Sequence, residues 1–264
     1  MKRIAWVKAL SNFLFLLIVF VSGNIFGQEP APGITAIENP GSISDEQFKY
    51  KTAMVSGLNG DIWIAFEKWD IDNAFPALTR YNAAEGWTVY NKSNSLLPSD
   101  TVYALFIKDA ELFLGTNNGI AVYDYSNNSI SLFEGNNTLP VKSIKAIAVS
   151  DNYLYAGTNG GLFIYSFQNH TWSHYLSSNS GLIYDIVNVL ALTDNDCIWV
   201  GTNQGLSFFN HHVWNNFTNQ NTIMSNHSIH ALHCDSKNRL WISTFYGKRY
   251  RVENNIFTDL SNEL

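Results

Sequence analysis

The segment Ile198-Trp-Val-Gly-Thr-Asn-Gln-Gly-Leu206 decides the fold, because the chain repeats it along most of its length. Further copies, the first of them partial, begin at Ile62, Leu112, Leu154 and Leu240. Equivalent positions in the five copies, spaced 42 to 50 residues apart, are Ala65, Gly115, Gly157, Gly201 and Ser243. Such regular spacing indicates one structural unit that is used five times.

Each copy belongs to a unit of four short segments with β-strand patterning, which we call strands A to D. Strand A alternates, as in residues 102–107, and strand B is the repeated segment itself. A Thr-Asn-x-Gly turn leads to strand C, and strand D carries an aromatic-x-x-aromatic pattern such as Trp172 to Tyr175. Four strands in about 40–45 residues are typical of one blade of a β-propeller.

We therefore predict an all-β fold, a β-propeller of about five four-stranded antiparallel blades. The predicted units cover approximately residues 51–90, 101–133, 143–175, 186–217 and 228–260. The glycine at the end of strand B would allow neighbouring sheets to approach closely, and the aromatic rings of strands B and D would pack between blades. Acidic residues at one repeat phase are predicted to form turns: Asp109, Asp151, Asp194 and Asp235.

Two arrangements of the blades remain open, a closed ring and an open arc. Radial stacking needs neighbouring blades rather than a fixed number of them. The last residues, 260–264, resemble the linker at residues 90–96 that leads into another unit. Open blade edges would favour self-association.

The first 27 residues resemble an export signal more than a part of the fold. Lys2, Arg3 and Lys8 precede an apolar run over residues 13–21, and small residues follow as far as Gly27. This order predicts a secretory signal peptide over residues 1–27, with an uncleaved anchor as the alternative. The rest is then exported, periplasmic or secreted, with a flexible leader over residues 28–50 and no membrane span after signal cleavage.

The charge of the chain argues against nucleic acid as a partner. The net charge is −6, and it becomes −9 without residues 1–27, which hold three basic residues and no acidic ones. A surface of this sign repels phosphate backbones, and no cluster of lysine and arginine offsets it.

Several motifs together resemble the two-component regulator propeller repeat. They are Leu97-Pro-Ser-Asp100 followed by Val102-Tyr-Ala-Leu105, Leu139-Pro140, and the segment from Ile198 to Phe209. The resemblance extends over about residues 51–260 and implies the periplasmic sensor portion of hybrid histidine kinases, several of which sense glycan fragments. The sequence departs from that family in having five units and no kinase or DNA-binding segment, which implies that it would signal only through another protein.

The one tryptophan of the repeat region that lies outside the repeat phase is Trp69. It belongs to an insertion between strands B and C of the first unit, with Asp70 and Asp72 beside it. An aromatic ring flanked by carboxylates on a loop suits ligand recognition, and covering the first blade is the structural alternative. The insertion lacks the glycine and the glutamate of a calcium-binding loop, so we expect no calcium site there.

A second candidate position precedes strand A, where the residue type varies from unit to unit: Asp100, Lys142, Asp185 and Asn226. Such variation would line a loop face with mixed polar groups, with Tyr103 and Tyr184 close by, and turn capping is the structural alternative. Asp100 and Asp185 could also serve as the acid and base of a propeller glycosidase or polysaccharide lyase.

We expect no cofactor and no metal. His227 and His233 are six residues apart on one strand, about 20 Å, which is too far for one zinc ion to bridge. Cys197 and Cys234 lie at the A–B turns of adjacent units, and the sequence leaves their pairing open. The favoured function is an exported, non-catalytic propeller that binds a glycan fragment or a partner protein.

Overall fold

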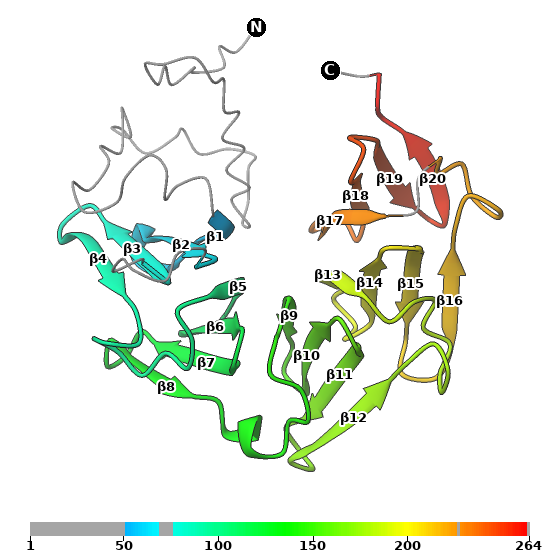
Figure 1. The fold of residues 1–264 in the computed structure, drawn as a ribbon. Helices are drawn as coiled ribbons and strands as arrows, with labels where there is room; N and C mark the ends of the chain where they lie inside the picture. The colour runs from blue at the N-terminus through cyan, green and yellow to red at the C-terminus, as the bar shows by residue number, and fades with distance from the viewer. Residues whose placement is uncertain (1–50, 69–75, 226–227, 263–264) are drawn as a thin grey trace, which may run out of the picture.

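A computed structural model describes residues 51–68, 76–225 and 228–262. These residues form five separate four-stranded sheets in which every neighbouring pair of strands is antiparallel. The sheets stand side by side around a common centre (Figure 1), and we call them blades 1 to 5 in chain order. The predicted five-bladed all-β architecture is confirmed.

The strands of the blades have the following bounds. Blade 1 holds β1 (Lys51–Ser56), β2 (Ile62–Phe66), β3 (Leu78–Asn82) and β4 (Gly86–Tyr90). Blade 2 holds β5 (Val102–Lys108), β6 (Glu111–Thr116), β7 (Gly119–Asp124) and β8 (Ser129–Leu132). Blade 3 holds β9 (Ala146–Val149), β10 (Tyr153–Thr158), β11 (Gly161–Ser166) and β12 (Thr171–Tyr175).

The last two blades follow the same order. Blade 4 holds β13 (Val187–Leu192), β14 (Ile198–Thr202), β15 (Gly205–Phe209) and β16 (Trp214–Phe217). Blade 5 holds β17 (Ile229–Cys234), β18 (Leu240–Thr244), β19 (Arg249–Glu253) and β20 (Ile256–Asp259). Two short 3₁₀ segments, η1 (Leu58–Gly60) and η2 (Glu134–Asn137), lie in connections.

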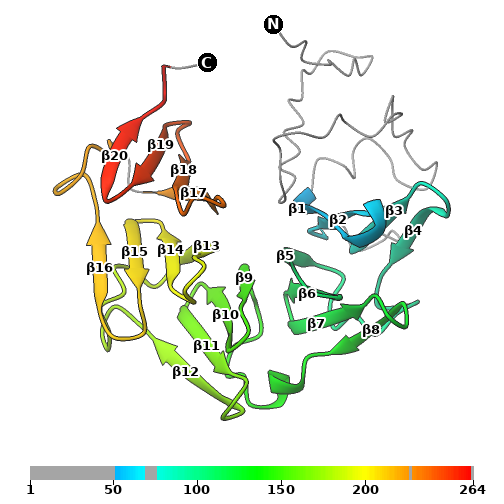
Figure 2. The same cartoon turned by 180° about the vertical axis from the view of Figure 1, so that it is seen from behind.

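The blades form an open arc. Their first strands are innermost and contact one another in the order β1, β5, β9, β13, β17. Among the described residues no contacts of that extent join β17 back to β1, and blades 1 and 5 stand at the two ends of the arc in both views (Figures 1 and 2). Of the two arrangements that the sequence leaves open, the structure shows the arc.

Glycines at the end of strand B allow consecutive blades to approach. A Cβ atom added to Gly201 would lie 2.6 Å from Cγ2 of Ile229, and one added to Gly115 would lie 3.1 Å from Cγ2 of Ile144. Ile144 and Ile229 stand at the start of the next blade, so a side chain on either glycine would collide with that blade. The predicted close packing at this position is confirmed.

Aromatic rings pack between the blades as predicted. Trp63 of blade 1 is fully buried, with its ring centre 4.6 Å from that of Tyr123 in blade 2. On the rim, the half-buried Trp172 donates its indole N–H to the carbonyl of Gly135, which lies between blades 2 and 3, at 2.9 Å. Trp63 on strand B thus lies deeper than Trp172 on strand D, which is the outermost strand of its blade.

The predicted turn aspartates differ among themselves. Asp235 accepts hydrogen bonds from the backbone amides of Lys237 and Arg239 at 2.9 and 3.0 Å, as a turn residue does. The carboxylates of Asp109 and Asp151 instead pair with the ammonium of Lys108 at 2.7 and 2.5 Å. The pair of Lys108 and Asp151 therefore joins blades 2 and 3, whereas Asp109 pairs with its neighbour inside blade 2.

The outward face of blade 5 differs from the equivalent faces inside the arc. In blades 2, 3 and 4, the strand C residues on the face of the strand B glycine are all apolar: Ile120, Val122, Leu162, Ile164, Leu206 and Phe208. Blade 5 has Arg249 and Arg251 at these two positions. No other described blade covers this face of blade 5, and a polar face is what an uncovered repeat of a stacked-repeat protein typically shows.

Blade 1 buries an ion pair. Asp61 is fully buried, and its carboxylate accepts hydrogen bonds from the guanidinium of Arg80 at 2.7 Å and from the amide of Asn82 at 2.5 Å. The exposed carboxylate of Glu85 reaches the same guanidinium at 3.2 Å. Arg80 is only 8% exposed, so Asp61 is the partner that compensates its charge in the interior.

Candidate functional site

A β-bulge interrupts the innermost strand at the same position in blades 1, 2, 4 and 5. The pairing register shifts by one residue between Lys51 and Ala53 in blade 1, and equivalent shifts occur in blades 2, 4 and 5. In blade 3, Lys145 precedes Ala146, which pairs with the strand B glycine as its counterparts do. The residues at this position are Thr52, Tyr103, Lys145, Asn188 and His230, and we call them the bulge residues.

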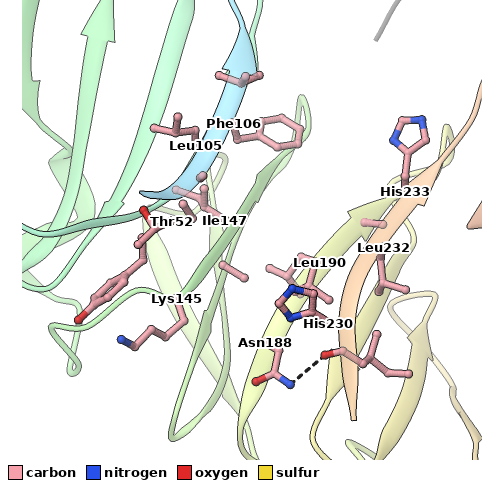
Figure 3. Close-up of a pocket in the computed structure, with 18 of the residues that line it drawn as sticks. Thr52, Leu105, Phe106, Lys145, Ile147, Asn188, Leu190, His230, Leu232 and His233 are labelled. Atoms are coloured by element: carbon pink, nitrogen blue, oxygen red, sulfur yellow. Dashed lines mark hydrogen bonds between the residues drawn. The ribbon is translucent and has the colours of Figure 1, made fainter. Parts of the chain in front are cut away.

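The bulge residues all line one central cavity. The cavity has a volume of about 960 Å³ and lies among the five innermost strands. A bulge leaves its extra residue outside the regular pairing and re-aims that side chain. In Figure 3, Lys145, Asn188 and His230 lie toward one end of the cavity, while Phe106 and His233 lie toward the other. The end with the bulge residues is the polar mouth.

Hydrogen bonds tie blades 4 and 5 together at this mouth. The amide nitrogen of Asn188 donates to the side-chain oxygen of Asn203 at 2.8 Å and to the carbonyl of Ile229 at 3.0 Å. The hydroxyl of Ser228 donates to the same Asn203 oxygen at 3.4 Å. Asn203 therefore uses its oxygen within the protein, and its amide nitrogen has no hydrogen-bond acceptor among the described residues.

A lysine and a tyrosine form the opposite side of the mouth. The ammonium of Lys145 stands 3.2 Å from the centre of the Tyr103 ring, within the range of a cation–π interaction. The Tyr103 hydroxyl lies 3.5 Å from both Glu67 and Asn117, at the limit of a hydrogen bond. Lys145 has no carboxylate within 4 Å among the described residues, so its charge is available to a ligand.

An exposed aromatic pair borders the mouth at blade 5. The β14–β15 turn and its counterparts in blades 2 and 3 carry Thr-Asn-x-Gly, whereas the blade 5 turn carries Phe245 and Tyr246. These side chains are 68% and 76% exposed, and Phe245 lines the cavity, with its ring centre 6.2 Å from that of His230. Sequence reasoning missed this pair, although the loss of asparagine from one copy of the turn marks it.

Deeper in the cavity the lining becomes apolar. Phe106, Ile147, Leu190 and Leu232 come from four different blades and surround the space beneath the mouth. Cys234 lies among them, and burial, followed by the carboxylates of Asp235 and Asp194, raises the pKa of its thiol to about 12. The thiol stays protonated at neutral pH and is a poor nucleophile.

The residues predicted from the sequence fall into three groups. Tyr103 is a bulge residue of the cavity, as described above. The insertion candidates Trp69, Asp70 and Asp72 lie outside the described residues. Asp100, Tyr184 and Asp185 lie in the connections that lead into β5 and β13, and none of them lines the cavity.

The two aspartates of the last group have structural partners. Asp100 accepts a hydrogen bond from the backbone amide of Lys92 at 2.7 Å and lies 3.7 Å from the ammonium of Lys68. Asp185 accepts one from the backbone amide of Ser177 at 2.7 Å. Each carboxylate thus caps the linker that precedes its blade, which is the turn-capping alternative.

The described part of the chain holds no group of three or more histidine, cysteine, aspartate and glutamate side chains that could bind a metal ion. Cys197 and Cys234 are both free thiols in the structure. The part of the chain that the structure describes contains no helix that is long and apolar enough to cross a membrane.

Comparison with family models gives one match. Residues 223–246, which include β17 and β18, match the family described as two component regulator propeller. The resemblance inferred from the sequence motifs is confirmed. No curated protein sequence matches the chain.

Solved structures show where the fold occurs. The extracellular domain of BT3049, assigned to the hybrid two component systems of B. thetaiotaomicron, is similar with a TM-score of 0.63 and 21% identity, over 82% of this chain and 29% of that one. Virginiamycin B lyase from Staphylococcus aureus gives a TM-score of 0.60 and 13% identity, over 83% of this chain and 71% of the lyase. PorZ, a surface component of the type-IX secretion system of Porphyromonas gingivalis, gives a TM-score of 0.56 and 13% identity, over 80% of this chain and 28% of PorZ.

At these identities the similarity shows the fold alone. This chain spans about 29% of the length of the BT3049 domain, so it corresponds to a part of that larger propeller structure. The propeller resembles the extracellular domains of two-component sensors, and it shares its fold with an enzyme as well.

Proposed function

We propose that this chain is an exported, non-catalytic binding module of the sensor type, and that its ligand occupies the central cavity. One observation carries the proposal. Five equivalent backbone positions, one from each blade, hold five different side chains, and all five line one cavity. A scaffold has no need of different polar groups at one repeat phase, whereas a specific site needs a few polar groups placed around an apolar pocket.

A glycan fragment is the ligand class that the mouth favours. Phe245 presents an exposed ring to the cavity that Asn188 and Asn203 also line, and the next residue, Tyr246, is exposed as well. Aromatic rings contact the apolar faces of sugars, and amides bond their hydroxyl groups. The similarity to extracellular domains of two-component systems supports a sensing role, in which a partner protein would read the bound state.

The enzymatic alternative has less support. Glycosidases need two carboxylates about 5–10 Å apart on either side of the bond that they cleave. Asp100 and Asp185 cap linkers, and in the part of the chain that the structure describes the cavity lining includes neither aspartate nor glutamate. The virginiamycin B lyase shares the fold at 13% identity, which carries no catalytic residue over to this chain.

Thermal unfolding of the purified protein with a panel of oligosaccharides tests the proposal. A ligand that binds the native state raises the midpoint with increasing concentration, by an amount that follows its affinity. We expect Phe245→Ala and Asn203→Ala to reduce the shift strongly. Leu132→Ala, at an equally exposed apolar position on the rim of blade 2, serves as the control and should keep it.

Other outcomes have distinct meanings. If the shift persists in both cavity variants but is lost in Trp69→Ala, the predicted insertion rather than the cavity is the site. If no sugar moves the midpoint, a partner protein replaces the glycan as the occupant of the mouth. Cleavage products from any sugar of the panel would contradict the non-catalytic assignment.

A further inference from the structure

The charge of the cavity lining runs opposite to that of the chain. The chain carries 22 acidic and 16 basic residues. Within the described residues that line the cavity, aspartate and glutamate are absent, and the charged or titratable nitrogen groups belong to Lys145, His230 and His233. The carboxylate of Glu67 lies 3.5 Å from the Tyr103 hydroxyl and more than 4 Å from the Lys145 ammonium. The described lining of the cavity is therefore basic, whereas the chain as a whole is acidic.

The position of Lys145 is set by the fold. Its backbone N–H donates to the carbonyl of Gly157 at 2.8 Å, which anchors the residue at the position of blade 3 that corresponds to the bulges of the other blades. The Tyr103 ring, 3.2 Å from the ammonium, stabilises the charge without neutralising it. An ammonium has three donors, and the ring occupies one side of it, so the side toward the cavity can bind an anionic oxygen.

A second donor completes the arrangement. The side-chain oxygen of Asn203 accepts hydrogen bonds from Asn188 and Ser228, and within the described part of the chain its amide nitrogen donates to no protein group. Because blades 3 and 4 are neighbours, Lys145 and Asn203 belong to adjacent parts of the same mouth. Two donors with no acidic residue among the lining groups match a carboxylate better than a neutral hydroxyl.

We propose that the ligand of the central cavity carries a carboxylate, which pairs with Lys145 while its carbon skeleton contacts the apolar lining below. This inference rests on the proposed binding function and names its substrate class: acidic sugars such as uronates, rather than neutral ones. A simple ring acid without sugar hydroxyl groups also carries a carboxylate on a ring, so the experiment must distinguish it from an acidic sugar.

Calorimetric titration of the full chain with three probes tests the inference. The probes are trigalacturonate, a neutral galactose trisaccharide and cyclohexanecarboxylate. We expect trigalacturonate to bind, the neutral trisaccharide to bind at least tenfold more weakly, and the affinity for the acid to fall with added salt. If cyclohexanecarboxylate is the one probe of the three that binds, the carboxylate requirement stands, but the ligand is a simple acid and not a sugar.

Variants of Lys145 locate the anion. Lys145→Gln should weaken the binding of the acid about 10- to 100-fold, which is the range for a hydrogen bond to a charged group, and Lys145→Arg should restore most of it. Lys142→Gln removes an exposed lysine outside the cavity and should change nothing. An unchanged unfolding midpoint of each ligand-free variant shows that the fold is intact.

Two results would overturn the inference. If the neutral trisaccharide binds as well as the acid and Lys145→Gln has no effect, the cavity binds sugars without a charge requirement, and the proposed function survives alone. If none of the three probes binds while another member of the oligosaccharide panel does, the inferred carboxylate on the ligand is contradicted, and the proposed glycan-binding function is retained. If the whole panel fails as well, the proposed glycan function fails with it.

Discussion

Gly157 at the end of β10 lies against Val187, the first residue of blade 4. A Cβ atom on Gly157 would stand 2.5 Å from Cγ1 of Val187 and 3.1 Å from Cβ of Ala146. Carbon atoms in protein interiors approach to about 3.5–4.0 Å. The absent side chain therefore sets the spacing between blades 3 and 4, and with it the place of Lys145 and Asn188 around the cavity.

Replacing Gly157 by alanine should destabilise the protein by about 1–3 kcal/mol, the usual range for overpacking a buried position. The unfolding midpoint should fall by about 2–4 °C for each kcal/mol in a chain of this size. Gly160→Ala is the matched control, because its nearest neighbour, Oγ1 of Thr158, would be 3.9 Å away. Equal midpoints for the two variants in a thermal scan would show that the blades are free to move apart.

The buried pair of Asp61 and Arg80 should respond strongly to the loss of one partner. Asp61→Asn leaves the Arg80 guanidinium without its buried counter-ion, and we expect a cost of about 3–5 kcal/mol in urea unfolding. Glu85 also pairs with this guanidinium, but its own side chain is 60% exposed. Glu85→Gln should therefore cost only about 0–1 kcal/mol. Similar costs would mean that water reaches Arg80 in the folded protein.

Asp235 should make the stability depend on pH in the acid range. Burial opposes its ionisation, but hydrogen bonds from the side chains of Arg239 and Trp241 and from backbone amides outweigh burial and hold its pKa well below the usual range. A lowered folded-state pKa stabilises the protein above the unfolded pKa of about 3.9, and this contribution is lost as the pH falls below it.

The matching experiment compares Asp235→Asn with the parent protein in urea at pH 7 and pH 3. We expect the variant to be less stable by about 1–3 kcal/mol at pH 7 and the difference to shrink at pH 3. Asp151→Asn, whose side chain is 84% exposed, is the control and should show a small difference at both values. A difference for Asp235→Asn that stays constant with pH would contradict the assigned role of the ionised carboxylate.

The arginines on the outward face of blade 5 should keep that face from associating. The double variant Arg249→Leu, Arg251→Ile reproduces the apolar pairs of the inner blades on a face that no blade covers. Because contiguous exposed apolar surface drives association, the average mass in light scattering should rise with concentration. Lys237→Leu, an exposed residue in the β17–β18 turn, should leave the mass unchanged. An unchanged mass for the double variant would show that other residues protect this face.

The comparison of two varying positions shows how far a sequence can locate a site. Residues before strand A and residues within it both change from unit to unit, so variation alone ranks Asp100 and Tyr103 equally. The structure separates them: Asp100 binds the amide of Lys92, whereas Tyr103 lines the cavity. The difference arises from a bulge, which depends on how many residues oppose one another across two paired strands.

The sequence by itself determined the blade, the number of blades and the glycine between neighbouring blades, because these follow from patterns within about 40 residues. Only the tertiary structure decided that the blades form an open arc, that Lys145 faces the Tyr103 ring, and that the described residues lining the cavity include no carboxylate. The reason is physical. Residues of five different blades meet at the centre, and their meeting depends on the curvature of the stack and on the bulges in four of the innermost strands, neither of which a local pattern contains.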